Sequence, residues 1–263
     1  MERAFVLEVS VLELVDLQKR YAGRQVLAGA SLAVGNGEAV ALVGANGSGK
    51  TTLLRCAVGL HHLDAGRVLV DGLDITRESR VARARMSYLP QRPEFPLTLT
   101  VREILSVAAD LRGLPSAAVD REMSLCGLTP LASRTVSKLS GGERQRVALA
   151  TLLMPDVALY LIDEPTANLD EDGTELVINR VAALRDRGCA ILFTSHVGSD
   201  VDRLATRTVV LRGGRVESRS VMGEEDGHVV GGSARGAGGV RNGVVGRMRG
   251  AREWPRAVAA RPR

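Results

Sequence analysis

Short, nearly continuous apolar runs recur along the chain and predict strands that are buried on both faces. Three of them, at residues 39–43, 158–162 and 190–194, are rich in Val, Ile, Leu and Ala. Longer stretches with helical spacing separate these runs, as the crossover connections of a parallel sheet require. The pattern therefore predicts an α/β fold built on a parallel sheet.

Two further patterns predict additional subdomains. Residues 12–21, 25–34 and 66–72 alternate apolar and polar positions or end at Gly-Asn, Gly-Glu or Asp-Gly, which favours a small antiparallel sheet. Residues 101 to about 154 have helical spacing, most clearly at 102–113 and 143–154. We therefore expect a parallel-sheet core, a small antiparallel β-subdomain and a helical subdomain at about residues 95–155.

Charge is distributed unevenly along the 263 residues and marks a domain boundary. The formal net charge of +5 comes entirely from residues 218–263, which contain nine arginines, four acidic residues and ten glycines. This segment lacks an apolar period, so we expect a disordered tail after a domain at 11–217. Weak binding to phosphate or anionic lipid is the alternative for the tail. Residues 1–217 have balanced charge and lack the basic surface that nucleic-acid binding needs, so no nucleic-acid partner is expected.

Composition also limits where the chain works. No stretch reaches the roughly 18 consecutive apolar residues of a membrane-spanning helix, so we do not expect the chain to cross a bilayer by itself. Glu2, Glu8 and Glu13 interrupt the N-terminal apolar residues, which argues against a signal peptide and favours the cytoplasm. The three cysteines form no CxxC pair and are expected to be reduced thiols.

A glycine-rich loop directly follows the apolar run at 39–43 and fits the phosphate-loop pattern GxxxxGK[ST]. Its glycines allow successive backbone N–H groups to face bound phosphates, and the helix that begins there adds a partial positive charge. The lysine of the pattern is a mobile positive charge for the β and γ phosphates, and the hydroxyl after it is a Mg²⁺ ligand. The loop comprises Gly44, Ala45, Asn46, Gly47, Ser48, Gly49, Lys50, Thr51 and Thr52.

Two adjacent carboxylates, Asp163 and Glu164, end the apolar run at 158–162. Neighbouring side chains on a strand point to opposite faces, so the two carboxylates cannot do the same task. Asp163 suits the Mg²⁺ shell, mostly through water. Glu164 then faces a water that attacks the γ-phosphate.

A second glycine-bearing helix start appears at residues 139–146, which read LSGGERQR. Two phosphate-facing elements and one lysine-bearing loop indicate that two subunits share each nucleotide. With this segment the sequence closely resembles the ATP-binding cassette (ABC) ATPases over about residues 11–217. Their LSGGQ motif is matched as LSGGE, ahead of the Asp-Glu-Pro at 163–165.

The resemblance implies roles for further residues. Tyr21 matches the aromatic residue that stacks on adenine, and Gln91 matches the glutamine that reaches toward Mg²⁺ and the attacking water. His196 matches the histidine that contacts the γ-phosphate, and Asp170 lies in the loop that crosses to the partner subunit. Glu164, Gln91 and His196 together imply an active ATPase with ATP and Mg²⁺ as its cofactors.

The resemblance also implies an assembly of two copies that bind head to tail around two ATP molecules. Ser140, Gly141 and Gly142 of one copy then face the γ-phosphate held by Lys50 of the other. A single cassette without membrane spans resembles the ATP-hydrolysing subunit of a transporter whose transmembrane permease is a separate chain. That reading places the protein on the cytoplasmic side of the cell membrane, and the resemblance favours an exporter as the transporter that it serves.

Two points stay open. The alternative function is a soluble, non-transport ABC ATPase that acts on nucleic acid or ribosomes, although the long insertions typical of such proteins are missing. Phe95, Leu97 and Leu99 are candidates for a groove that receives the permease, or else belong to the core of the helical subdomain.

Adjacent His61 and His62 lack further ligands at metal-binding spacing and are expected in a solvated loop.

Overall fold

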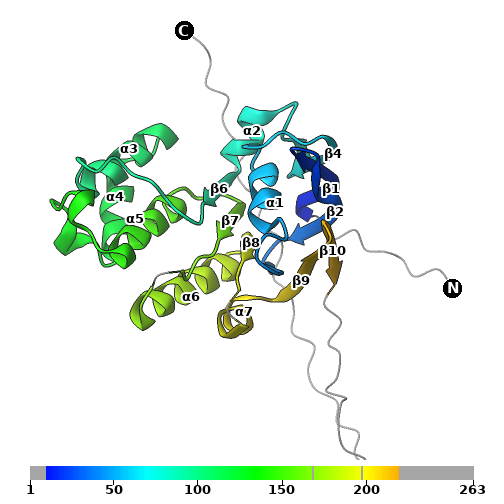
Figure 1. Cartoon of the computed structure of the whole chain (residues 1–263). Coiled ribbons are helices and arrows are strands. Elements are labelled where there is room, and N and C mark those ends of the chain that lie inside the picture. Colours follow the sequence, from blue (N-terminus) through cyan, green and yellow to red (C-terminus); the bar gives the residue numbers. More distant parts are fainter. Residues whose placement is uncertain (1–9, 168, 197, 219–263) are drawn as a thin grey trace, which may run out of the picture. The chain divides into compact units, whose positions relative to one another are not determined.

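The computed structural model describes residues 10–218 except 168 and 197. The chain divides into two units, residues 1–218 and 219–263, and every described residue belongs to the first (Figure 1). The disordered tail expected from the sequence therefore lies outside the described residues, apart from Ser218. That residue ends the last strand and pairs with Val209.

A six-stranded sheet forms the centre of the fold (Figure 1). Its strand order is β10-β9-β3-β8-β7-β6, and all neighbouring strands are parallel except the edge pair of β9 and β10. The strands are β3 (Ala39–Val43), β6 (Met86–Leu89), β7 (Leu159–Asp163), β8 (Ala190–Thr194), β9 (Arg207–Arg212) and β10 (Arg215–Ser218). The central strands β7 and β8 are buried at every position, as their uninterrupted apolar sequence predicts.

A second sheet is antiparallel and has the order β2-β1-β4-β5. Its strands are β1 (Ser10–Tyr21), β2 (Arg24–Gly35), β4 (Ala65–Val70) and β5 (Leu73–Asp74). The backbone N–H of Ala28 in β2 donates to the carbonyl of Gly214 between β9 and β10, at 2.8 Å. This bond joins the two sheets beside the phosphate loop, because β9 runs alongside β3.

Helices connect the strands of the central sheet. They are α1 (Lys50–Ala57), α2 (Ser79–Ala84), α3 (Val101–Arg112), α4 (Ser116–Leu125), α5 (Gly141–Leu153), α6 (Glu171–Asp186) and α7 (Gly198–Leu204). Between α4 and α5 lie two short 3₁₀ turns, Thr129–Leu131 and Val136–Lys138. In the described residues no helix is long and apolar enough to span a membrane.

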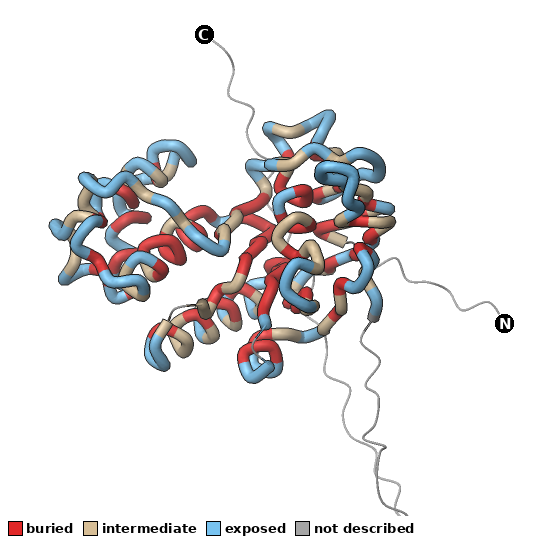
Figure 2. Tube along the Cα trace, viewed as in Figure 1, coloured by how far each residue is buried: buried red, intermediate tan, exposed pale blue. Residues whose placement is uncertain are grey.

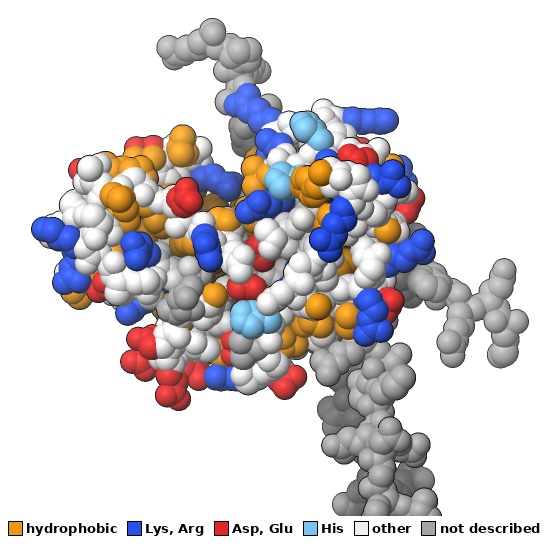
Figure 3. Space-filling view, in the orientation of Figure 1, with side chains coloured by type: hydrophobic (Ala, Val, Ile, Leu, Met, Phe, Trp, Pro, Cys, Tyr) orange, Lys and Arg blue, Asp and Glu red, His pale blue; other side chains and the backbone are white. Residues whose placement is uncertain are grey.

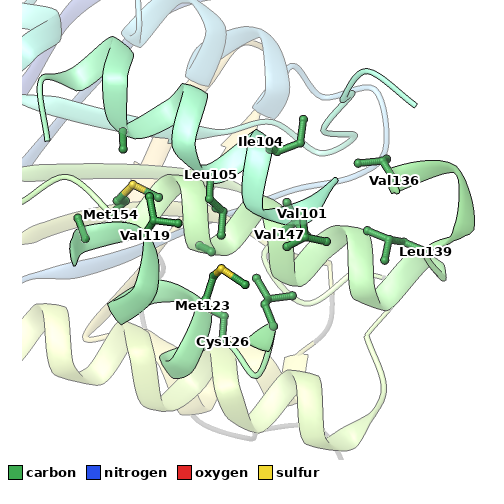
Figure 4. Packing of buried hydrophobic residues seen from close by; sticks show 14 residues of the cluster. Val101, Ile104, Leu105, Val119, Met123, Cys126, Val136, Leu139, Val147 and Met154 are labelled. Atoms are coloured by element: carbon green, nitrogen blue, oxygen red, sulfur yellow. The ribbon is translucent and has the colours of Figure 1, made fainter. Parts of the chain in front are cut away.

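The helical lobe of α3, α4 and α5 has its own apolar core (Figure 4). Leu105 from α3, Met123 from α4 and Val147 from α5 point toward one another in this core. In Figure 2 buried residues follow the strands of the central sheet and the inward sides of these helices. The periodic apolar positions at 102–113 and 143–154 thus stabilise the lobe by burial against each other.

One buried ion pair connects the helical lobe with the core. Glu122 of α4 has 2% of its side chain exposed, and it accepts a hydrogen bond from Arg180 of α6 at 2.6 Å and one from its neighbour Arg121 at 3.2 Å. Leu176 of α6 also packs against the apolar core of the lobe. The docking of α6 therefore has both an apolar and a charged contribution.

The three cysteines are free and buried. Burial raises the pKa of the Cys56 thiol to about 11 and that of Cys126 to about 12. Both thiols are therefore protonated at neutral pH and poor nucleophiles.

Candidate nucleotide site

The phosphate loop lies between the end of β3 and the start of α1, where its sequence requires glycine at two positions. Gly49 has φ +104° and precedes the first helical residue, Lys50. A Cβ on Gly44 would lie 2.7 Å from the carbonyl oxygen of Leu211 in β9. No side chain caps the start of α1, so its first N–H groups remain available to an anion.

Lys50 is 7% exposed and its ammonium group points back into the loop. Its Nζ donates to the carbonyl oxygens of Gly44 and Ala45 at 2.7 and 3.2 Å. These bonds hold the positive charge at the centre of the loop, where the helix start adds to it. The loop is thus an anion site whose charge comes from one lysine and backbone dipoles.

The candidate catalytic residues all follow the carboxyl ends of parallel strands, which lie at one edge of the sheet. Gln91 follows β6, Asp163 ends β7 and His196 follows β8. The phosphate loop follows β3 at the same edge. Residues far apart in sequence therefore converge because of strand order.

The Glu164 carboxylate lies between two of the predicted site residues. Its Oε2 accepts a hydrogen bond from Nε2 of Gln91 at 2.8 Å, and its Oε1 lies 3.3 Å from Nδ1 of His196. The His196 side chain is 56% exposed, whereas that of Glu164 is 14% exposed. The three residues predicted to be catalytic are thus in direct contact.

The backbone of Glu164 has φ +54°, which is unfavourable for a residue with a side chain. Its N–H donates to the hydroxyl of Thr194 at 3.0 Å. That hydroxyl in turn donates to Oδ1 of Asp163 at 2.6 Å. A single buried hydroxyl therefore fixes both the carboxylate of Asp163 and the backbone of Glu164.

Thr194 is a functional candidate that the sequence interpretation missed. The apolar pattern of residues 190–194 predicts only that Thr194 is the last residue of a buried strand. The parallel register of β7 and β8 places it opposite Asp163. One sequence feature points to Thr194. It is a polar residue at the end of an otherwise apolar strand, and the neighbouring strand ends in the acidic pair.

A cavity of about 420 Å³ contains much of the predicted nucleotide site. Tyr21 is among the residues that line it and is 41% exposed. Arg24 and Val26 of β2 also line this cavity, although no sequence motif indicated them. The other lining residues are Asn46, Gly47, Gly49, Lys50, Thr51, Thr52, Gln91 and Glu164.

Ser140, Gly141 and Gly142 are not among the residues that line this cavity. Ser140 is the N-cap of α5, and its hydroxyl accepts the N–H of Glu143 at 3.1 Å while the Glu143 carboxylate accepts the Ser140 N–H at 2.7 Å. Ser140 and Gly141 are exposed. The LSGGE motif is thus an exposed helix start fixed by a reciprocal capping box.

Asp170 also caps a helix. Its Oδ1 accepts the N–H of Gly173 in the first turn of α6 at 2.8 Å. Asp170 therefore fixes the end of the loop that runs from Glu164 to α6. Within the same loop, the hydroxyl of Thr166 donates to a carboxylate oxygen of Asp200 in α7 at 2.5 Å.

The residues proposed for Mg²⁺ suit that ion. Oδ2 of Asp163 is buried and finds no hydrogen-bond partner among the described residues, while Oδ1 is held by Thr194. An unpaired buried carboxylate oxygen is costly without a cation or water beside it. Thr51 and Gln91 line the nucleotide cavity, and their side chains carry neutral oxygens of the kind that Mg²⁺ accepts together with water and phosphate.

A second depression of about 640 Å³ lies between the segment after Gln91 and the start of α5. Phe95 and Leu97 line it, and Leu97 is 58% exposed. Leu99, by contrast, is not among its lining residues and packs against the apolar core of the helical lobe, as Phe95 also does in part. Of the three leading candidates for a receiving groove, Leu97 is the one that faces solvent most.

The fold and this site define a phosphate-loop nucleotide-binding protein. The sequence profile of the ABC transporter family matches residues 27–167. The Nod factor export ATP-binding protein I of Rhizobium etli is 35% identical over 218 residues, covering 81% of this chain and 68% of that protein. Its counterpart in Paraburkholderia xenovorans is 38% identical over 211 residues, covering 78% and 69%.

Solved structures agree with this similarity. An ATP-binding subunit of an ABC transporter superposes with a TM-score of 0.74 and 28% identity, covering 80% of this chain and 90% of that one. A nucleotide-free ATP-binding cassette from an ABC transporter has a TM-score of 0.70 and 23% identity, which supports the fold.

The chain belongs to the ABC transporter family. It binds ATP and is the ATP-hydrolysing component of a transporter that includes a membrane partner. The predicted α/β cassette with its antiparallel and helical subdomains is confirmed.

Proposed function

We propose that two copies of this chain bind head to tail and enclose two ATP molecules. In each site Lys50 and its loop hold the phosphates of one ATP, and Ser140, Gly141 and Gly142 of the other copy approach its γ-phosphate. The supporting observation is that the exposed start of α5 lies outside the cavity that contains Lys50. Asp170, in the loop before α6, then faces the partner copy.

Within each site Glu164 orients the attacking water and takes its proton. Gln91 and His196 hold the two carboxylate oxygens of Glu164, at 2.8 and 3.3 Å, so that the carboxylate keeps one orientation. In this proposal Gln91 and His196 also face the γ-phosphate. This contact among three side chains, beside Lys50, is the observation that carries the proposal. Catalysis then comes mainly from positioning and charge stabilisation.

The adenine stacks on Tyr21, beside the residues of β2 that also line the cavity. When bound, Mg²⁺ supplies positive charge beside the phosphoryl group that is transferred. Thr51, Asp163 through water, and Gln91 would hold it.

Mixing two inactive variants tests the head-to-tail arrangement. Lys50→Ala removes one half of each site and Ser140→Ala the other half, so each variant alone lacks an intact site. In an equimolar mixture, half of the dimers are mixed and contain one intact site, which restores about a quarter of wild-type ATPase activity. An arrangement in which each copy forms a complete site alone predicts no recovery.

We further propose that the permease is a separate chain and that this subunit binds it from the cytoplasmic side, through the depression lined by Phe95 and Leu97. An exporter is the transport direction favoured by the two relatives, which are named for Nod factor export. Expression of the chain together with the membrane protein encoded beside it, followed by affinity purification, tests this partnership. Recovery of a multi-span membrane protein supports it, whereas stimulation of the ATPase by DNA without membrane association contradicts it.

A matched pair of leucine variants locates the surface that binds the permease. Leu97→Asp should prevent the co-purification and leave the basal ATPase activity unchanged, since Leu97 is not among the residues that line the nucleotide cavity. Leu125→Asp is the control, because Leu125 is also an exposed leucine, at 45%, and lies at the end of α4.

A further inference from the structure

The loop after α1 contacts the aromatic residue of the nucleotide cavity. The Tyr21 hydroxyl lies 2.5 Å from Nδ1 of His61, and the two rings meet edge to face with centroids 5.8 Å apart and an interplanar angle of 72°. His61 is partly buried, whereas His62 beside it is exposed. The expectation of a solvated loop therefore does not describe His61.

Two further contacts restrain the same tyrosine. The ammonium group of Lys19 lies over the Tyr21 ring, 5.3 Å from its centroid, which is a favourable cation–π distance. Lys19 is itself paired with Asp64 at 3.2 Å, and the other oxygen of Asp64 accepts the N–H of Arg20 at 2.6 Å. The loop from His61 to Asp64 thus holds the end of β1 through both side-chain and backbone bonds.

His61 is also fixed to the helix that starts in the phosphate loop. The N–H groups of Leu60 and His61 both donate to the carbonyl of Arg55 in α1, at 2.8 and 3.2 Å. Because α1 begins at Lys50, the contact between His61 and Tyr21 links the helix that starts in the phosphate loop with the aromatic residue of the cavity. Burial and the charges of Arg55 and Lys19 lower the pKa of His61, so its ring is neutral at neutral pH and one nitrogen accepts a hydrogen bond.

We propose that His61 is a positioning residue for ATP: it holds the Tyr21 ring in the orientation that stacks on adenine. The inference depends on the proposed role of Tyr21. A ring that is already oriented binds the base without losing side-chain freedom at that moment, so the contribution appears in nucleotide affinity. It does not appear in the chemical step, because neither side chain is among the residues proposed to act at the γ-phosphate.

Titration calorimetry of the full chain with ATP and with ADP tests this role. His61→Ala and Tyr21→Phe each remove one side of the same hydrogen bond, and each should raise the Kd of both nucleotides by roughly three- to tenfold. The double variant should lose no more than either single variant, because both remove one interaction. The kcat at saturating ATP should not change.

Matched variants separate this role from a general effect on the loop. His62→Ala changes the exposed neighbour and should leave both Kd values at the wild-type level. His61→Asn keeps a polar atom near the position of Nδ1 and should recover most of the affinity. Equal thermal midpoints without nucleotide show that each variant is folded.

Three results would overturn the inference. In the first, the Kd is unchanged in both His61→Ala and Tyr21→Phe, while Tyr21→Ala still weakens nucleotide binding. That result would exclude the role of His61 and leave the proposed adenine contact of Tyr21 intact. Another is an equal loss in His62→Ala. The third is an unchanged Kd in Tyr21→Ala, which removes the proposed adenine role of Tyr21 itself and this inference with it.

Discussion

Both the backbone and the side chain of Glu164 are constrained by their neighbours. Its φ of +54° costs about 1 to 3 kcal/mol, an amount that neighbouring contacts must offset. Gln91 and His196 hold its carboxylate, and Thr194 holds its N–H. Such strain at one residue indicates a carboxylate whose position matters for the reaction.

Glu164→Gln should reduce ATP turnover by at least about a hundredfold, because an amide cannot take a proton from the attacking water. ATP binding should remain, since the Lys50 loop is unchanged. ATP and Mg²⁺ should therefore convert the variant into a stable dimer that gel filtration detects. Turnover at the wild-type rate would exclude the proposed role of Glu164.

Thr194→Val removes the hydroxyl that joins Asp163 to the N–H of Glu164, with little change in volume. We expect kcat to fall on the order of tenfold and a higher Mg²⁺ concentration to be needed, since the carboxylate of Asp163 and the backbone of Glu164 each lose a hydrogen bond that orients them. Binding of Mn²⁺ with ADP, followed by electron paramagnetic resonance, should weaken in parallel. Thr194→Ser keeps the hydroxyl and should restore both properties; an equal loss in the two variants would contradict this role.

At the scale of elements, helices do most of the positioning through their ends. The start of α1 faces the phosphate loop, the start of α5 presents Ser140, and the start of α6 is capped by Asp170. Between the lobes, α6 docks on α4 through the buried pair of Arg180 and Glu122. The orientation of the LSGGE motif relative to the core thus depends in part on one buried charge pair.

Glu122→Ala should lower the free energy of unfolding by about 3 kcal/mol, because it leaves the largely buried guanidinium of Arg180 without its carboxylate partner. Chemical denaturation of the full chain measures the change. Asp120→Ala is the matched control on the same helix: its ion pair with Arg102 is exposed, at 63% and 50%, and should contribute less than about 1 kcal/mol. Equal losses in the two variants would contradict the prediction.

At the scale of the whole molecule, charged side chains are distributed over the face that Figure 3 presents. Figure 3 shows acidic side chains gathered over α6, while Arg and Lys side chains lie scattered over the other elements. The net charge of +5 arises from the segment after Glu217. The anions that matter for function are the phosphates of ATP, and in the proposed site one lysine and the helix starts bind them.

Deletion of residues 219–263 should leave ATPase activity and ATP-dependent dimer formation unchanged. The deletion keeps β10, whose last residue Ser218 pairs with Val209. Turnover assays and gel filtration of the truncated and full-length proteins test the expectation. A large loss of either property would show that the segment takes part in the ATPase.

Local patterns account for much of what the sequence alone determined. The apolar runs at 39–43 and 190–194 coincide with β3 and β8, and the run at 158–162 is displaced by one residue from β7. The phosphate loop and the Asp163-Glu164 pair were evident because the residues of each lie next to one another. Their chemistry follows from residue type and a neighbouring strand, so it is readable without any distant contact.

Only the tertiary structure decided which distant residues meet. Gln91 and Glu164 are 73 positions apart, Tyr21 and His61 are 40 apart, and Thr194 reaches Asp163 across 31. These contacts depend on strand order and register. The summed burial of many side chains selects that order and register, and no short segment of sequence encodes them. The sequence therefore determined which groups perform the chemistry, and packing of the sheets decided how they are oriented.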